Sequence, residues 1–465
     1  MTKLYTLTAT ELSPLIETKQ VSPVEIMKSI ITRMEEMEPR INAYITLTQE
    51  LALQQAKNAE NLIIKGFYLG PLHGIPIGMK DNIYTKGIRT TGGSETLKNF
   101  VPDYNATVVK KLLCAGSVMT GKTNMHEFGG GITNTNPTFG NTKNPWNVNY
   151  IPGGSSGGSA AALKAGLATI ATGTDTFGSI RVPASMCGIY GLKPTYGLVS
   201  AYGVAPLAWS LDHVGPMARS VNDLALMLNE MVGYDPKDPG SIKTPDHDYT
   251  KLIGKGIKGV KIGVPTFFLK DLEEDVEKLF MRAVKLLEQL GAKIVEMEIP
   301  ELTMSAYANY VITTGEASSY HYERLQEQSE QFADDVRIFF QTGVITNTPQ
   351  YVRAQQARRK LTDAFHKAFE KVDILIGPTI PIVPKPFAEN YVEQNLSVTE
   401  KCMPFTSSAN NTGTPSLSVP IGLATNGMPV GMQLIGKHFS EKLLLQVGAR
   451  WEKTEPLVNS NRSSL

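Results

Sequence analysis

Residues 151–162 read IPGGSSGGSAAA, which places two adjacent hydroxyls, Ser155 and Ser156, inside a frame of four glycines. The run SAAALKAGLA that follows from Ser159 is rich in helix formers, and the strand-like run LATIATG overlaps its end. A flexible linker would continue into further disorder, so the linker interpretation fails. The glycine loop instead opens a closely packed helix, whose first amide groups would face an anion.

Short apolar runs alternate with helical patterns over most of the remaining chain. These runs are GIPIGM, SVMTG, LATIATG, VKIGVPTFF, KIVEMEIP, VDILIGP, PSLSVPIGL and VGMQLIG. Such alternation predicts an α/β fold with a central, mixed and largely buried β-sheet that helices cover on both faces. We expect a single large domain.

Four segments of that domain differ in their pattern of apolar and polar residues. Residues 1–65 are expected to be a helical segment, where SPVE at Ser22–Glu25 forms a capping box and Pro39 ends the helix. Residues 66–234 hold the predicted catalytic core, and 235–398 are more polar and more helical, as in a variable cap. Residues 399–465 are expected to return to the core sheet.

The composition restricts the class of protein. The 465 residues carry 45 basic and 44 acidic side chains, a balance that argues against a dedicated binder of nucleic acid or acidic membranes. There is no apolar signal segment and no apolar run of membrane-spanning length. Cys114, Cys187 and Cys402 are far apart and fit neither a metal site nor a disulfide framework, so we expect reduced thiols and a cytoplasmic location.

Three tempting features are interpreted as structural. The stretch GSVMTGKT at 116–123 matches the phosphate-loop pattern, but its middle positions look like a strand and no helix follows, so we expect a buried strand. His126–Glu127 lacks a second histidine four residues on, which argues against a metal site. Arg358 and Arg359 are expected on an exposed helix face, with a role in binding a substrate carboxylate as the alternative.

Ser179 is a candidate nucleophile because it follows a strand-like run in a loop of small residues, where a hydroxyl and several amide protons can face one spot. The base that would activate Ser179 has two kinds of candidate, a histidine and a lysine. His213 follows Asp212, and His247 lies between two aspartates, yet neighbours in sequence seldom point at each other, so a Ser–His–Asp triad stays open. Lys80 comes after the apolar run GIPIGM, where burial would keep its amine neutral.

The chain resembles the amidase-signature hydrolases from about Leu72 to Pro216, and again at GTPSLSVPIGL and GMQLIGK. The motif GGSSGGS…GTDTFGSIRVPAS carries the resemblance, and KTNMHEF, NPWN and GLKPTYG fit it too. The resemblance implies a Ser–cis-Ser–Lys triad in which Ser179 is the nucleophile, Ser155 follows a cis peptide bond and relays the proton, and Lys80 is the base. It also implies substrate-binding or oxyanion-hole roles for Gly129 and for the amides of Thr176, Phe177, Gly178 and Ser179.

Three further residues are expected to support this site. Ser156 is interpreted as a structural hydrogen-bonding residue, and Asp175 and Arg181 as residues that hold the nucleophile loop. The chain departs from the family at Phe177, where glycine is usual. A side chain there would narrow the acyl pocket, and it would be strained if the backbone needed a positive φ.

We therefore expect a stand-alone amidase that hydrolyses a small carboxylic amide to the acid and ammonia or an amine, with no cofactor and no metal. The first alternative is the glutaminase-type A subunit of a glutamyl- or aspartyl-tRNA amidotransferase, which would need accessory subunits. The second is an inactive scaffold that binds a partner. No direct contact with nucleic acid or membrane is expected, and the oligomeric state stays open, a homodimer included.

Overall fold

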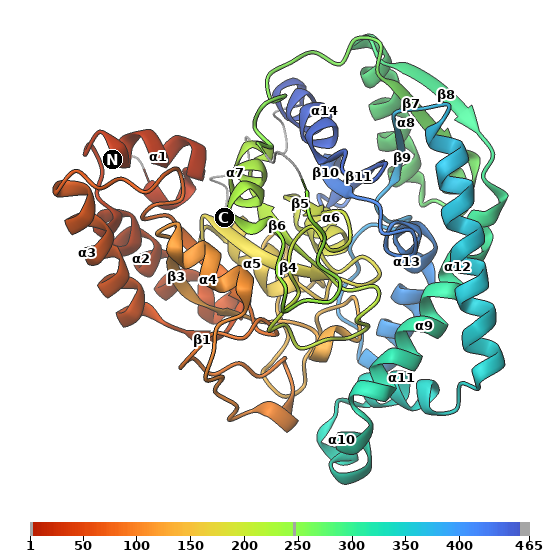
Figure 1. The fold of residues 1–465 in the computed structure, drawn as a ribbon, viewed down its shortest axis with the longest axis horizontal. Helices are drawn as coiled ribbons and strands as arrows, with labels where there is room; N and C mark the ends of the chain where they lie inside the picture. Colours follow the sequence, from red (N-terminus) through yellow and green to blue (C-terminus); the bar gives the residue numbers. More distant parts are fainter. Residues whose placement is uncertain (1–2, 245–247, 456–465) are drawn as a thin grey trace.

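The described residues form an eleven-stranded mixed sheet in the order β1-β3-β2-β4-β6-β5-β10-β11-β9-β7-β8 (Figure 1). The computed structural model describes residues 3–244 and 248–455, so His247 lies outside it. Strands β2, β3 and β4 are parallel neighbours, as are β7, β8 and β9, while the pairings that involve β6, β5, β10 and β11 are antiparallel. The strands are β1 (Tyr44–Leu47), β2 (Pro76–Lys80), β3 (Val118–Thr123), β4 (Ile170–Asp175), β5 (Tyr190–Lys193), β6 (His213–Ala218), β7 (Lys261–Pro265), β8 (Lys293–Met297), β9 (Ile374–Pro378), β10 (Ser416–Leu423) and β11 (Pro429–Gly436).

Helices pack on both faces of this sheet, which confirms the predicted fold class. The helices are α1 (Ala9–Glu17), α2 (Pro23–Ile41), α3 (Gln49–Ile64), α4 (Thr107–Cys114), α5 (Gly157–Ala165), α6 (Arg181–Cys187), α7 (Val221–Met231), α8 (Glu274–Gln289), α9 (Ser305–Tyr320), α10 (Tyr322–Glu327), α11 (Asp334–Val344), α12 (Thr348–Phe369), α13 (Tyr391–Asn411) and α14 (Glu441–Thr454). Each of the eight apolar runs overlaps a strand of the sheet.

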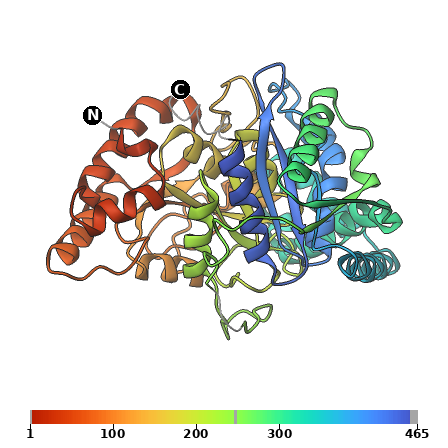
Figure 2. The same ribbon diagram turned by 90° about the horizontal axis from the view of Figure 1, so that it is seen from above.

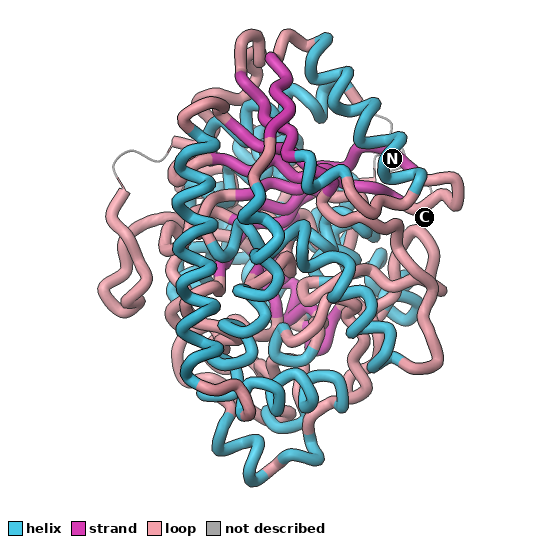
Figure 3. The backbone as a smooth tube through the Cα atoms, turned by 90° about the vertical axis from the view of Figure 1, so that its right-hand side faces the viewer, coloured by secondary structure: helices cyan, strands magenta, loops and turns pink. Residues whose placement is uncertain are grey.

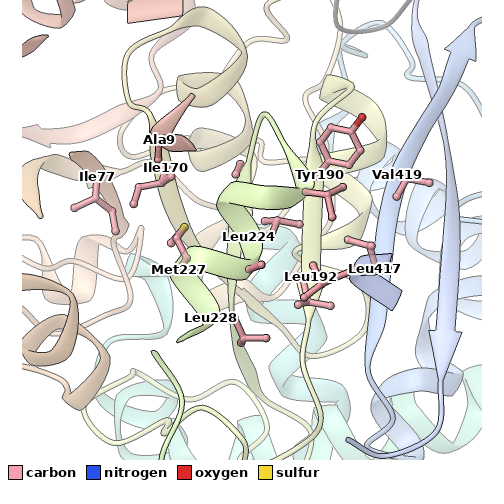
Figure 4. Close-up of a cluster of buried hydrophobic side chains, with 14 of the residues drawn as sticks. Ala9, Ile77, Ile170, Tyr190, Leu192, Leu224, Met227, Leu228, Leu417 and Val419 are labelled. Carbon is pink, nitrogen blue, oxygen red and sulfur yellow. The ribbon is translucent and has the colours of Figure 1, made fainter. Parts of the chain in front are cut away.

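Successive residues of strand β4 pack on opposite faces of the sheet. Ile170 of β4 lies in the buried cluster with Leu224 and Leu228 of α7 (Figure 4). The next residue, Ala171, packs instead with Ala160 of α5 and other small side chains of that face. This period of two is what a strand buried on both sides requires, and small residues let α5 approach the sheet closely.

The N-terminal segment differs from expectation in two places. A short strand, β1, pairs antiparallel with β3 inside the segment that was predicted to be helical. Helix α2 also continues past Pro39 and ends at Ile41, because Asn42 takes the left-handed conformation at φ 55°. The Glu38 carboxylate then accepts hydrogen bonds from the amides of Ala43 and Tyr44, which starts β1. The predicted capping box at Ser22 is present.

The segment 235–398 supplies three strands as well as helices. Strands β7, β8 and β9 extend the sheet at the edge opposite the N-terminal helices (Figure 2). Helix α9 packs against α11, α12 and α13, and these long helices stand beside one another on that side of the molecule (Figure 3). Strands β10 and β11 then return to the centre of the sheet.

Candidate active site

Two parallel neighbours, β2 and β4, bring the candidate residues to one edge of the sheet. Lys80 is the last residue of β2 and Asp175 the last of β4, and the strands pair with Ile77 opposite Ile170. Parallel strands carry their carboxyl ends to the same edge, where ligand sites of α/β sheets form. Helix α5 begins beside them, directly after Ser155 and Ser156.

Lys80 is fully buried and its ammonium or amine group contacts two hydroxyls. Its Nζ lies 2.8 Å from Ser155 Oγ and 2.7 Å from Thr174 Oγ1. Burial lowers the pKa of Lys80 to about 7, opposed only in part by the charges of Asp175 and Asp212. Those two carboxylates bond instead to Arg181 and to Thr176, so Lys80 has neither as an ion-pair partner.

Ser155 is fixed through its own backbone. The Gly154–Ser155 peptide bond is cis, and the Ser155 carbonyl accepts a hydrogen bond from the His126 amide at 3.2 Å. The following amide, that of Ser156, donates to the Ser179 carbonyl at 3.2 Å, which joins the two serine segments. A Cβ built on Gly129 would lie 3.4 Å from Ser155 Oγ, so Gly129 lies at the site.

The Ser179 hydroxyl is buried and has no hydrogen-bond partner among the described residues. It follows β4 in a loop whose shape Asp175 fixes. The Asp175 carboxylate accepts hydrogen bonds from the amides of Gly178 at 2.8 Å and Ile180 at 3.1 Å. An unpartnered buried hydroxyl beside a rigid loop is unusual for a structural residue and typical of a functional one.

Asp175 and Arg181 form a buried ion pair that supports this loop. Arg181 Nε and Nη2 each lie 3.0 Å from a carboxylate oxygen of Asp175, and Asn410 of α13 donates to the same carboxylate. Burial alone would raise the pKa of Asp175, but the charge of Arg181 and its hydrogen bonds outweigh it and hold that pKa well below its usual range. The predicted holding function of this pair therefore has a geometric basis.

One of the four amides that were predicted to bind the oxyanion, that of Gly178, is not available for this role. Its amide already donates to Asp175, so it is not free to bind an oxyanion in this structure. The amides of Thr176, Phe177 and Ser179 form no hydrogen bond to any other described residue. Gly178 contributes conformation instead: its φ is +133°, and a Cβ there would meet Thr406 Oγ1 at 2.8 Å.

Phe177 does not strain the loop. It is absent from the positive-φ residues of the described chain, and its side chain is 1% exposed in an apolar cluster with Phe339 of α11. The ring is part of the apolar surroundings of the nucleophile loop, and the narrowing of the acyl pocket stays a prediction. The backbone strain considered for Phe177 is therefore not found in the described chain.

Ser156 makes the structural hydrogen bonds that were expected of it. Its hydroxyl lies 3.3 Å from both the amide and the carbonyl of Thr174, which ties the start of α5 to β4. Sequence reasoning missed Thr174 itself, whose hydroxyl also accepts a hydrogen bond from Asn82. Thr174 stands in the quoted motif, but nothing in its local pattern separates it from the neighbouring threonines.

No ring nitrogen of a described histidine forms a hydrogen bond with Ser155 or Ser179. His213 Nδ1 lies 2.6 Å from the Leu211 carbonyl, His126 pairs with Asp335, and His321 stacks on Phe340. The Ser–His–Asp alternative thus has no geometric support in the described residues.

The other features that were interpreted as structural also have structural explanations, with one correction. Residues 118–123 form strand β3, and the buried Lys122 amine donates to the Thr90 hydroxyl at 3.0 Å rather than facing a phosphate site. Arg359 is exposed, as predicted, but Arg358 is half-buried and donates to the Asn411 carbonyl and to Ser210. These bonds tie Arg358 to the end of α13 and to the segment at Ser210, which corrects its predicted exposure.

Comparison with known proteins identifies the family of this chain. The family model described as Amidase matches residues 25–445, and the chain belongs to this family, the amidase-signature enzymes, whose members hydrolyse amides. Over 476 residues the chain is 42% identical to the A subunit of the glutamyl-tRNA(Gln) amidotransferase of Thermoanaerobacter pseudethanolicus, covering 97% of both.

Two solved structures resemble the fold closely. One, from a study of a vestigial protein complex and the origins of an s-triazine catabolic enzyme, gives a TM-score of 0.90 at 32% identity, covering 96% of this chain and 98% of that one. The other is the peptide amidase of Stenotrophomonas maltophilia, with a TM-score of 0.84 at 31% identity and 96% coverage of both chains. In the described part of the chain, no helix is long and apolar enough to cross a membrane.

Proposed function

We propose that the protein is a stand-alone amidase in which Ser179, Ser155 and Lys80 form the catalytic triad. One observation carries the proposal: a buried lysine with a pKa of about 7 contacts Ser155, whose segment is bonded to that of an unpartnered Ser179. A serine nucleophile needs a base, and a lysine kept neutral by burial can serve as one.

The proton moves in two steps during acylation. Ser179 Oγ attacks the amide carbonyl while its proton passes to Ser155 Oγ, and the Ser155 proton passes to the neutral amine of Lys80. The relay then runs backwards and protonates the leaving nitrogen as the C–N bond breaks. Water, deprotonated through the same relay, hydrolyses the acyl-enzyme ester and releases the acid.

The developing oxyanion would be stabilised by the amides of the nucleophile loop. Thr176, Phe177 and Ser179 offer amide groups that are free of other described partners. The loop is held before substrate arrives, because Asp175, Arg181 and Asn410 bond to it. Preorganised donors of this kind are the largest single contribution in many acyl-transfer enzymes.

The second candidate function is the A subunit of a tRNA amidotransferase, which would release ammonia from glutamine for a partner protein. The relative at 42% identity favours it. The similarity to a peptide amidase and the predicted self-sufficient site favour the stand-alone enzyme. Free cysteines at positions 114, 187 and 402 support a reducing, cytoplasmic location for either.

Ammonia release by the purified single chain tests the proposal. The panel holds glutamine, asparagine, a short aliphatic amide, benzamide and an amino-acid amide, with Ser179→Ala as the control. Release from a simple amide that depends on Ser179 and needs no added protein supports the stand-alone amidase. Release from glutamine alone, rising when other subunits are added, supports the amidotransferase function.

A further inference from the structure

A cavity of about 410 Å³ is lined mainly by apolar side chains of α9, α11 and α13. Its volume is in the range of sites for small molecules. The wall includes Ala306, Tyr310, Phe339, Leu396 and Met403. The exposed residues Tyr307, Leu396 and Glu400 form its rim, whereas Phe339 and Met403 are buried in its depth.

Three relationships place this cavity near Ser155 and near the loop that carries Ser179. Gly130 lines it, and the preceding residue, Gly129, borders Ser155. The rings of Phe339 and Phe177 have centroids 6.4 Å apart, and Phe177 is two residues before Ser179. Asn309, the neighbour of Tyr310 on α9, donates to the Thr176 carbonyl at 3.2 Å. These neighbours make the cavity a candidate for the chain of a substrate whose carbonyl carbon reaches Ser179.

The charged side chains that line the cavity are acidic. Asp335 and Glu400 line it, and no lysine or arginine is present among the lining residues that the structure describes. Asp335 is held 3.0 Å from His126. A substrate carboxylate entering here would lose its water without gaining a cation, which is costly, and would also meet the two acidic side chains.

We infer that this cavity binds the acyl chain of the substrate and selects amides of uncharged, apolar acids over those that carry a carboxylate, such as glutamine. The inference rests on the proposed function of Ser179. The Thr399 hydroxyl, which lines the cavity and has no described hydrogen-bond partner, offers one polar contact for an uncharged group on the chain.

A matched pair of substrates tests the selectivity. Hexanamide and the monoamide of adipic acid (adipamate) have the same carbon chain, and only adipamate ends in a carboxylate. We expect kcat/KM for hexanamide to exceed that for adipamate and for glutamine by about 100-fold or more. Equal or greater kcat/KM for adipamate or glutamine would overturn the inference. It would favour a different cavity, of about 390 Å³, whose lining includes Thr174 and Lys237.

Variants locate the selectivity in this cavity. Phe339→Ala should lower kcat/KM for hexanamide about tenfold while changing that for acetamide, which is too short to reach the wall, less than about threefold. Phe339→Leu should restore most of the loss, and Tyr322→Ala, an exposed aromatic of α10 outside the cavity, should match the wild type. Equal losses on both substrates in a folded Phe339→Ala enzyme would contradict the assignment.

A fluorophosphonate probe separates the two possible failures. If the probe labels Ser179 but hexanamide is not preferred, the inference is wrong and the proposed nucleophile stands. If Ser179 is not labelled and no amide is hydrolysed, the proposed function fails, and the inference fails with it.

Discussion

Lys80 Nζ lies 2.8 Å from Ser155 Oγ, while the two carboxylates that act on its pKa, Asp175 and Asp212, are bonded to other groups. The arrangement leaves the lysine charge without a direct counter-ion, so burial is the main influence on its pKa, which falls to about 7. A lysine that is partly neutral near physiological pH can accept a proton from Ser155. Because its pKa lies close to that pH, both protonation states of the amine are accessible during the reaction.

The rate should depend on pH through Lys80. Because only the neutral amine accepts a proton, kcat/KM for an uncharged amide should be low below pH 6, rise through about pH 7 and level off above about pH 8. The measurement is a pH profile with hexanamide or another substrate that does not titrate. A profile that is flat from pH 5.5 to 9, or that rises only near pH 10, would show that Lys80 is not the base.

Lys80 should also lower the stability of the fold. The unfolded chain binds a proton on this lysine below its ordinary pKa of 10.5, whereas the folded chain does so only below about 7. Unfolding is therefore favoured by about 4 kcal/mol at pH 7 and by only about 1 kcal/mol at pH 9.5. Part of this cost should be removed in Lys80→Met.

Urea unfolding at both pH values checks this effect. The free energy of unfolding of the inactive Lys80→Met variant minus that of the wild type should increase as the pH is lowered from 9.5 to 7. A stability difference that stays constant with pH would show that burial does not depress the pKa of Lys80.

Removing the Asp175 charge should damage both stability and activity. Asp175→Asn leaves Arg181 buried without its counter-ion and weakens the acceptor of the Gly178 and Ile180 amides. Breaking a buried ion pair in this way costs about 3–5 kcal/mol. Thermal unfolding should show the loss, and Asp363→Asn, which breaks the exposed pair with Arg359, should change stability by less than about 0.5 kcal/mol.

The conformation of Gly178 should be essential to the loop. Gly178→Ala forces a side chain into φ +133° and against Thr406 at 2.8 Å, so kcat should fall by about 100-fold or more. Gly427→Ala is the matched control, because that glycine also has a positive φ, +78°, but no atom lies within 4 Å of its built Cβ. Near-normal kcat in Gly178→Ala would show that the loop geometry is not needed for catalysis.

The alternating pattern of the sequence was sufficient to predict the fold class, since each apolar run that was singled out overlaps a strand. The local sequence pattern did not predict structure that depends on contacts between distant segments. Strand β1 is only four residues long and forms by pairing with β3 and through the Glu38 carboxylate, neither of which a helical pattern reveals. Arg358 likewise has an exposed-helix pattern, yet Ser210 and Asn411 approach it from distant segments.

Some residues of the candidate site could likewise be predicted from the sequence, and others could not. Ser155, Ser179 and Lys80 stand in motifs that resemble a family, so their assembly could be anticipated from the sequence. The occupied Gly178 amide could not, because it depends on which way the Asp175 carboxylate turns. Thr174, Asn410 and the apolar cavity depend on contacts between strands and helices that are far apart in the chain.

The most direct test of the central claim is to map the residue that becomes acylated. The wild-type enzyme is mixed with a slowly deacylating activated ester, quenched in acid, digested and sequenced by mass spectrometry. The account predicts an acyl group on Ser179, formed far more slowly in Lys80→Met and absent in Ser179→Ala. An acyl group on another residue, or a normal burst of product from Ser179→Ala, would contradict it.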